Sequence, residues 1–387
     1  MLAGQIASAF GDAISLTAMP LLVLVLTGSG ALMGTVAALQ FVPDIVLGLP
    51  VGAIVDRWDR RKVMIWSDFG RAVLTMAIPL TYWLGGPTLA VVLIVVMPIA
   101  TLRLLSDSAL ASSIPRLVGR DNLARANGYM EATLTIPFVL GPALAGILVA
   151  LIGAASTIAI DAASFALSAV GLLFVRRSLR AEREAKMPSV VVDIREGIAF
   201  VWRHAQLRAM VVLRTLIQVG ITPLLPILAI YITIQRGFGE ELFGFVGSAW
   251  SIGYLGGSIL VGRLGAGRAG LRLILCGLLM AAAMVAIALS VEPVVYFVAG
   301  AVFGLALAIG IVSFMTMRMA VTPDVMMGRV GSAARTIVVA VQPIALLGLG
   351  ALADAANAGV ALLVMAAIAG GGSLVFLASR SFRESKY

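Results

Sequence analysis

The segment from Gly52 to Lys62 reads GAIVDRWDRRK, and it places two carboxylates and four cations within eleven residues. The stretches on both sides of it are strongly apolar. Because charge at this density is not tolerated in the hydrocarbon of a bilayer, the segment is predicted to form a tight turn at a membrane face. The chain is therefore expected to cross a membrane both before and after this turn.

The composition of the whole chain supports this interpretation. Of its 387 residues, 61% are hydrophobic and only 12% are charged, whereas soluble proteins carry about 25% charged residues. A membrane-spanning helix needs about 20 apolar residues. We therefore predict an all-α integral membrane protein with twelve spans, at residues 3–26, 31–55, 63–84, 88–112, 127–150, 154–175, 207–234, 243–262, 271–290, 293–317, 331–353 and 357–379.

The positive charges are distributed unevenly among the predicted loops. The loops after even-numbered spans and the C-terminal tail hold 24 of the 28 Lys and Arg residues, and the odd-numbered loops hold only Arg236. By the positive-inside rule, the even-numbered loops and both termini are predicted to be cytoplasmic. This distribution accounts for the net charge of +9, so we expect no nucleic-acid partner. The N-terminus lacks a basic region and a cleavage site, so no signal peptide is expected.

A hydrophilic segment from Arg176 to Arg208 divides the spans into two groups of six. We predict a six-helix bundle at residues 1–178, a cytoplasmic linker at 179–205 and a second six-helix bundle at 206–387. A shift of 206 residues places Pro137 on Pro343 and Arg57 on Arg263, which indicates a faint internal repeat. Parallel six-span halves around a central site are a common arrangement of secondary transporters.

The charged segment resembles the signature loop between helices two and three of the major facilitator superfamily, Gly-x-Leu-Ala-Asp-Arg-x-Gly-Arg-Lys. The matching positions are Gly52, Asp56, Arg57 and Arg60, with Ile54 for Leu, Arg61 for Lys, and Asp59 in place of the second Gly. The form Asp-Arg-x-Asp-Arg-Arg is similar to the branch of macrolide-efflux and siderophore-export proteins. The resemblance implies two six-helix bundles around a cavity that opens alternately to each side. It also implies a cytoplasmic gating loop, which Asp107 at the end of span four is expected to meet at Arg60.

A second motif lies in the fifth predicted span, where residues 137–146 read PFVLGPALAG. It is similar to the Gly-x-x-x-Gly-Pro-x-x-Gly-Gly pattern of exporters in the same superfamily, with matches at Gly141, Pro142 and Gly146 and departures at Pro137 and Ala145. Small residues four apart let helices approach closely, and prolines bend a helix. We interpret the motif as a seal or pivot, with plain helix packing as the alternative.

Several acidic residues lie inside predicted spans, where a carboxylate costs about 2.5–3.5 kcal/mol on insertion scales. Asp12 belongs to a polar stripe at helical spacing in span one that also contains Gln5, Ser8 and Ser15. Asp44 follows Gln40 by one turn in span two. Our hypothesis is that Asp12 or Asp44 takes up a proton when the cavity faces outward. The alternative is a hydrogen-bonded structural carboxylate.

Other polar residues in the spans are candidates for coupling or substrate binding. Arg103 and Asp107 are one turn apart and can pair along their helix, and Arg103 is a candidate for proton coupling or substrate contact. Glu131 is a further coupling candidate, and it could instead form an ion pair with Arg214 between the halves. The remaining substrate-cavity candidates are Arg214 and Gln218 on span seven and Ser251 and Tyr254 on span eight. For Asp68 with Arg71 we expect a structural pair, and for Asp161 capping or packing.

The sequence argues against catalysis and cofactors. A single His excludes a His-Glu-x-x-His zinc site, and none of the three Lys residues is followed by the Ser or Thr of a nucleotide-binding loop. We therefore predict no enzyme, no metal and no cofactor.

The predicted function is proton-coupled efflux of small apolar or amphipathic compounds across the plasma membrane of a bacterial cell. The expected partners are a small-molecule substrate, protons and the lipid bilayer, and the protein is expected to be a monomer. Three alternatives stay open: a symporter or uniporter that imports a polar solute, a membrane sensor or scaffold that does not transport, and an intramembrane enzyme, against which the missing catalytic residues argue.

Overall fold

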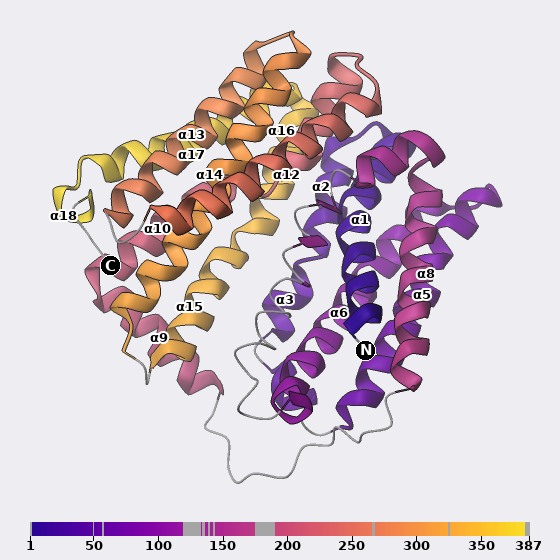
Figure 1. Ribbon diagram of the computed structural model, residues 1–387. Helices are drawn as coiled ribbons and strands as arrows, with labels where there is room; N and C mark the ends of the chain where they lie inside the picture. The colour runs from indigo at the N-terminus through magenta and orange to yellow at the C-terminus, as the bar shows by residue number, and fades with distance from the viewer. Residues whose placement is uncertain are drawn as a thin grey trace. The chain divides into compact units, whose positions relative to one another are not determined.

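A computed structural model describes residues 2–48, 50–55, 58–118, 133, 136–137, 140–141, 144–174, 190–264, 268–323 and 326–383. All the regular elements identified in these ranges are helices (Figure 1). Eleven of the described segments are long and apolar enough to cross a membrane: Gly4–Thr27, Gly30–Leu47, Arg60–Trp83, Thr88–Ala111, Ala154–Leu173, Ala205–Gln235, Glu241–Arg263, Ala269–Leu289, Pro293–Val321, Arg329–Ala355 and Ala358–Leu377. They correspond to eleven of the twelve predicted spans, and half of the remaining one, 127–150, lies outside the described residues. The all-α membrane fold is therefore confirmed.

The chain forms two compact units. The first contains Met1–Gly28 and Val36–Met187, and the second contains Ser29–Thr35 and Pro188–Tyr387. The change from one unit to the other near residue 187 falls within the linker predicted at 179–205.

The first unit is built on four long helices, α1 (Leu2–Thr27), α5 (Arg60–Trp83), α6 (Thr88–Val118) and α8 (Ala154–Leu173). Helix α8 packs against both α1 and α5, and α5 packs against α6 (Figure 1). The short helices α3 (Val42–Leu47) and α4 (Val51–Val55) lie against α6. Polar residues on α1, α5, α6 and α8 can therefore meet inside this unit.

Proline residues interrupt three spans that the sequence predicted as continuous. The predicted span 31–55 consists of α2 (Gly30–Leu39), α3 and α4, and Pro43 occupies the first turn of α3. Proline has no N–H to donate and clashes with the preceding turn, so it starts a helix more readily than it continues one. Asp44 therefore lies in the first turn of α3 and not in the middle of a long helix. The other two breaks are at Pro223 and Pro343.

The second unit contains the helices from α9 to α18. Helices α12 and α14 pack closely at Gly253 and Gly304. A Cβ atom at either position would collide with the backbone of the opposite helix. Small residues permit such close crossings in membrane proteins. The elements are α9 (Val190–Arg203), α10 (Ala205–Ile221), α11 (Leu224–Ala229), the π-helix η2 (Ile230–Gln235), α12 (Glu240–Arg263), α13 (Ala269–Leu289), α14 (Pro293–Val321), α15 (Met327–Ala340), α16 (Gln342–Ala355), α17 (Ala358–Leu377) and α18 (Arg380–Arg383).

The first turn of α2 belongs to the second unit and is held there by Asp354 of α16. The Asp354 carboxylate accepts hydrogen bonds from the backbone N–H groups of Gly30 (2.5 Å) and Ala31 (2.9 Å) and from the Ser29 hydroxyl (2.7 Å). A carboxylate at a helix N-terminus satisfies N–H groups that have no partner within the helix. Asp354 thus caps a helix that lies more than 300 residues earlier in the chain.

Candidate functional site

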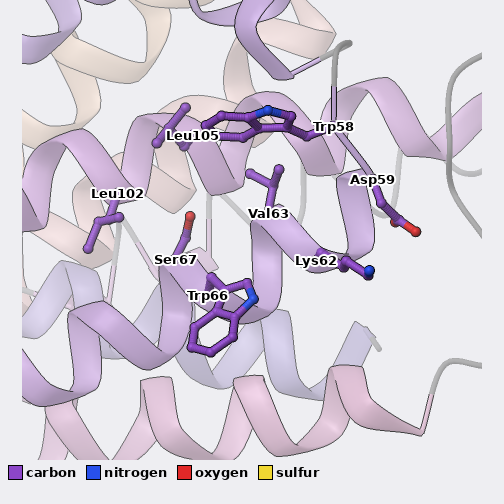
Figure 2. Close-up of a pocket in the computed structure, with 8 residues that line it drawn as sticks. All are labelled: Trp58, Asp59, Lys62, Val63, Trp66, Ser67, Leu102 and Leu105. Carbon is purple, nitrogen blue, oxygen red and sulfur yellow. The ribbon is translucent and has the colours of Figure 1, made fainter.

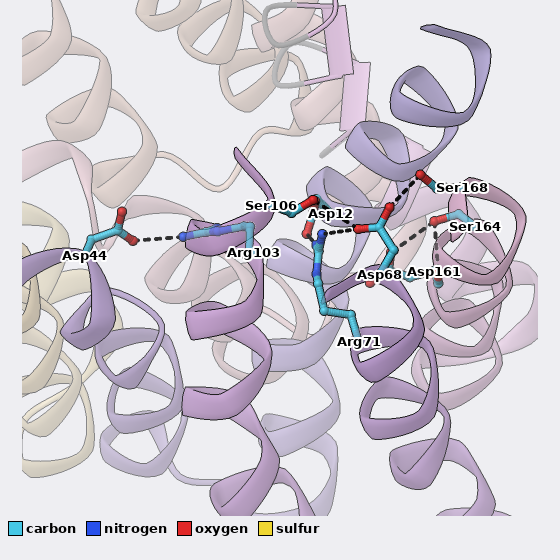
Figure 3. Close-up of polar contacts among 9 residues, drawn as sticks. All are labelled: Asp12, Asp44, Asp68, Arg71, Arg103, Ser106, Asp161, Ser164 and Ser168. Carbon is cyan, nitrogen blue, oxygen red and sulfur yellow. Dashed lines mark hydrogen bonds and ion pairs between the residues drawn. The ribbon is translucent and has the colours of Figure 1, made fainter. Parts of the chain in front are cut away.

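Arg71 of α5 is the centre of a buried group of charges in the first unit. Its side chain is only 2% exposed. The guanidinium donates a hydrogen bond to Asp12 of α1, and its Nη1 lies 3.7 Å from Oδ1 of Asp68, one turn earlier on α5 (Figure 3). The Arg71 Cζ atom lies 3.8 Å from the centre of the Phe165 ring of α8. The predicted pairing of Asp68 with Arg71 is confirmed.

The acidic residues around Arg71 are tied to neighbouring helices. Asp68 accepts hydrogen bonds from Ser168 of α8 (2.7 Å) and Ser106 of α6 (3.3 Å). Asp161 of α8 is also buried and lies close enough to Arg71 for an electrostatic interaction, and it accepts a hydrogen bond from Ser164 (3.4 Å). We refer to Asp12, Asp68, Arg71 and Asp161 as the Arg71 cluster.

The Arg71 cluster contains three carboxyl groups and one guanidinium. If all three carboxyl groups were ionised, the cluster would carry a net charge of −2. A low dielectric opposes such an excess, and like charges that share a site favour binding of a proton. The arrangement can therefore hold and release a proton without disrupting the whole set of ion pairs.

A second ion pair joins Arg103 of α6 to Asp44 of α3. The distance from Arg103 Nη2 to Asp44 Oδ2 is 3.0 Å, and both side chains are largely buried (Figure 3). Asp107, one turn from Arg103 on α6, lies close enough to it for an electrostatic interaction, but no ion pair joins the two among the described residues. The break at Pro43 begins α3 beside α6, so its first turn brings Asp44 to Arg103.

A small cavity connects the two sets of charges. Its volume of about 30 Å³ is enough for about two water molecules. Asp12 and Asp161 of the Arg71 cluster and Arg103 of the second pair all line this cavity. The predicted cavity residues Ser15 and Gln40 line it as well, together with Thr75. A carboxylate of the Arg71 cluster and the guanidinium of the second pair thus line the same space.

The other candidates of the first unit have varied positions. Gln5 donates a hydrogen bond to Ser168 (3.2 Å), and Ser8 is buried. Pro137 and Gly146 are buried, and Gly141 packs so closely on Ala13 of α1 that a Cβ atom there would collide with it. This contact agrees with the close packing expected of the motif. Pro142 of the motif lies outside the described residues. The coupling candidate Glu131 and the gating-loop residues Asp56 and Arg57 lie outside them as well.

The described part of the charged segment is anchored to α8 and α5. Arg61 donates hydrogen bonds to the backbone oxygens of Leu172 (3.1 Å) and Leu173 (2.8 Å), at the C-terminal end of α8. A cation is favourable at this end of a helix dipole. Asp59 caps the N-terminus of α5, Arg60 is buried, and Gly52 lies within α4.

The substrate-cavity candidates of spans seven and eight all lie in the second unit. Gln218 of α10 donates a hydrogen bond to Thr222 (3.0 Å), the C-cap residue of the same helix. Ser251 of α12 is buried and donates to the backbone oxygen of Gly247 (3.0 Å). Arg214 of α10 lies close enough to Tyr254 of α12 for an electrostatic interaction. None of these four residues belongs to the Arg71 cluster.

Sequence reasoning did not assign a site role to Arg71, Asp68 or Asp161. The available signal was the helical spacing of Asp161, Ser164 and Ser168, which puts three polar groups on one face of an apolar span. The same reasoning that singled out Asp12 applies to that face. What the sequence could not supply was the neighbour relation of α1, α5 and α8.

The long apolar helices define this chain as a multi-span membrane protein, and ion pairs lie buried between the helices of its first unit. The family model of the Major Facilitator Superfamily matches residues 1–346. The chain therefore belongs to the Major Facilitator Superfamily.

Among characterised relatives, the chain is similar to the multidrug efflux pump Tap of Mycobacterium tuberculosis. The two are 30% identical over 269 residues, which cover 67% of this chain and 62% of that pump. Macrolide efflux protein A of Streptococcus pyogenes is 27% identical, with 55% of this chain and 53% of the relative covered. The chain thus matches less than two thirds of the length of the first relative and about half of the length of the second.

Solved structures support the same fold. The nucleoside transporter NupG gives a TM-score of 0.75 at 13% identity, with 97% of each chain covered. A bacterial homologue of the human lysosomal transporter Spinster gives a TM-score of 0.73 at 12% identity, with 99% of this chain and 95% of that one covered. At such low identity the likeness concerns the fold alone.

Proposed function

We propose that the protein exports small apolar or amphipathic compounds, such as antibiotics, across a bacterial plasma membrane in exchange for protons. The named activities of the efflux relatives support export. The observation that carries proton coupling is the surplus of carboxyl groups around Arg71. In this proposal the protein acts as a monomer by alternating access, with both termini in the cytoplasm.

Asp12 is the member of the Arg71 cluster best placed to exchange a proton. Its side chain is 30% exposed, whereas the side chains of Asp68 and Arg71 are 1% and 2% exposed. Asp12 also lines the small cavity. Protonation of Asp12 weakens its attraction to Arg71, which then keeps Asp68 as its ionised partner. The protonation state of Asp12 thereby changes how firmly α1 is held to α5.

The Asp44–Arg103 pair is a second place where a proton or a substrate can act, because Arg103 lines the same cavity as Asp12. Glu131 is retained as a further coupling candidate. One proton that moves through 100 mV releases about 2.3 kcal/mol. At about 1.36 kcal/mol for each factor of ten, this energy sustains a substrate gradient of roughly fifty-fold. One titrating carboxylate is therefore sufficient for useful export.

The charged segment is proposed to act as a latch on the cytoplasmic side, through Asp56, Arg57 and Arg60. Single ion pairs at a wet membrane face contribute little, so a small network suits contacts that must break in every cycle. Replacing Asp56 with Asn is expected to slow transport while ligand binding stays measurable. Transport at the full rate in this variant would remove the latch from the proposal.

The test is uptake of a radiolabelled macrolide into inverted membrane vesicles with an imposed pH gradient. We expect wild-type protein to accumulate the macrolide, Asp12→Asn to lose gradient-driven uptake, and Asp44→Asn to reduce it. Glu292→Gln, in an exposed position before α14, is the matched control and should transport normally. Unchanged uptake in Asp12→Asn, in Asp44→Asn and in the double variant would refute the coupling assignment.

A further inference from the structure

A recess of about 620 Å³ lies at the start of α5, formed by residues that the proposed transport mechanism does not use for coupling. Helix α5 contributes four residues on one side of its first two turns, and α6 contributes two leucines one turn apart. The chain just before α5 completes the wall (Figure 2). The lining residues are Trp58, Asp59, Lys62, Val63, Trp66, Ser67, Leu102 and Leu105.

The recess has an apolar floor and an aromatic cover. Figure 2 shows the Trp58 ring lying across Val63 and Leu105, with the Ser67 hydroxyl below it. Ser67 is only 2% exposed, so it offers a polar atom within an otherwise apolar wall. Trp58 and Trp66, in contrast, are 58% and 69% exposed. Exposed tryptophan side chains at the end of a membrane span are typical of the boundary between hydrocarbon and lipid headgroups.

Lys62 and Asp59 are the two charged residues that line the recess. Lys62 is exposed and has no ion-pair partner among the residues that the structure describes. Asp59 is the acidic residue of the lining, but its carboxylate accepts a hydrogen bond from the N–H of Arg61 (2.9 Å) as the cap of α5. In Figure 2 this carboxylate points away from Trp58 and Ser67. Lys62 is therefore available to an external anion.

We infer that this recess binds an anionic phospholipid. The lipid phosphate would lie beside Lys62, the ester region near the Ser67 hydroxyl, and the first part of an acyl chain against Val63, Leu102 and Leu105. A lipid fits better than a soluble anion because most of the lining is apolar and because the recess is at the end of the span Arg60–Trp83. Basic side chains near a bilayer surface attract anionic lipids.

Two single-tryptophan variants test this inference in the full-length protein. One keeps Trp58 and the other keeps Trp83, at the opposite end of α5 and similarly exposed at 54%, with the remaining tryptophans replaced by Phe. Each is reconstituted in phosphatidylcholine bilayers with a fixed fraction of phosphatidylglycerol. Bromine is placed on the acyl chains of one lipid or of the other, and fluorescence quenching at equal mole fraction gives the enrichment of phosphatidylglycerol near each tryptophan.

At Trp58 we expect brominated phosphatidylglycerol to be enriched about fivefold over phosphatidylcholine. This factor corresponds to the attraction of about 1 kcal/mol between one basic residue and an anionic lipid surface. At Trp83 we expect no enrichment. Lys62→Gln should abolish the enrichment at Trp58, and Lys62→Arg should restore it.

Equal enrichment at the two tryptophans, or no change in Lys62→Gln, would overturn the inference. Loss of the enrichment when excess inorganic phosphate is added would assign the recess to a soluble anion instead. Because the single-tryptophan variants carry several substitutions, a second measurement uses protein with all its native tryptophans. The phosphatidylglycerol that co-purifies with wild-type protein and with Lys62→Gln is quantified, and equal amounts would also contradict a lipid site at Lys62.

Discussion

Replacing Arg71 with Met would remove the only cation of the Arg71 cluster and nearly preserve the apolar volume of its side chain. Asp68 and Asp161 would then be buried without that cation. The Asp68–Arg71 separation of 3.7 Å corresponds to an attraction of about 4 kcal/mol at an effective dielectric constant of about 20. Removing one partner of a buried ion pair costs about 3–5 kcal/mol. We expect Arg71→Met to lower the free energy of unfolding by an amount in this range.

The assay is equilibrium unfolding of the purified protein in mixed micelles, with helix content followed by circular dichroism. The matched control is Arg329→Met, because Arg329 and its partner Glu196 form a 2.7 Å pair with side chains that are 37% and 49% exposed. Exposed pairs contribute about 0–1 kcal/mol. The cost of Arg71→Met should also fall as the pH is lowered, because protonation removes the repulsion between the remaining carboxylates. A cost no larger than that of Arg329→Met would refute this reasoning.

Three further predictions concern other contacts. Gly141→Val should reduce the yield of folded protein, because the Cβ atom of the new side chain would collide with Ala13. Adding Ala13→Gly to this variant should recover part of the yield. An unaffected yield in the single variant would contradict the close contact. Asp354→Ala should lower the free energy of unfolding by about 1 kcal/mol, because it removes the cap of α2. The comparison is Asn357→Ala, which removes the N-cap side chain of α17. No measurable loss of stability in Asp354→Ala would rule out a stabilising cap. In a double-mutant cycle in the same unfolding assay, Asp44→Asn and Arg103→Gln should show a coupling energy of at least about 0.5 kcal/mol, whereas strictly additive effects would show that the 3.0 Å pair contributes nothing.

Much of the fold could be predicted from hydropathy, because a bilayer imposes both the length and the helical form of each span. Eleven predicted spans correspond to helical segments in the structure. The continuity of the spans was less predictable. Pro43, Pro223 and Pro343 each end one helix and begin another, whereas Pro20 and Pro79 remain inside α1 and α5. A proline in sequence does not reveal which of these outcomes the neighbouring helices will support.

The candidate site was predicted only in part. Asp12, Asp44 and Arg103 were found because an isolated charge in an apolar span requires an explanation. Their partners could not be chosen, because pairing depends on which helices are neighbours. Spacing along α6 suggested Asp107 for Arg103, but the contact of α3 with α6 provides Asp44. The spacing of three residues between Asp68 and Arg71 predicted that they pair with each other. It did not reveal that Arg71 also donates a hydrogen bond to Asp12 of α1.

The most direct test of proton coupling through the Arg71 cluster is to measure the protons released when a macrolide binds to the purified protein. The measurement uses a weakly buffered detergent solution with a pH-sensitive dye, and an independent binding assay confirms occupancy. We expect wild-type protein to release up to one proton for each bound macrolide, and Asp12→Asn to bind the macrolide without releasing a proton. Equal proton release by the wild-type protein and Asp12→Asn would contradict the assignment of the coupling proton to Asp12.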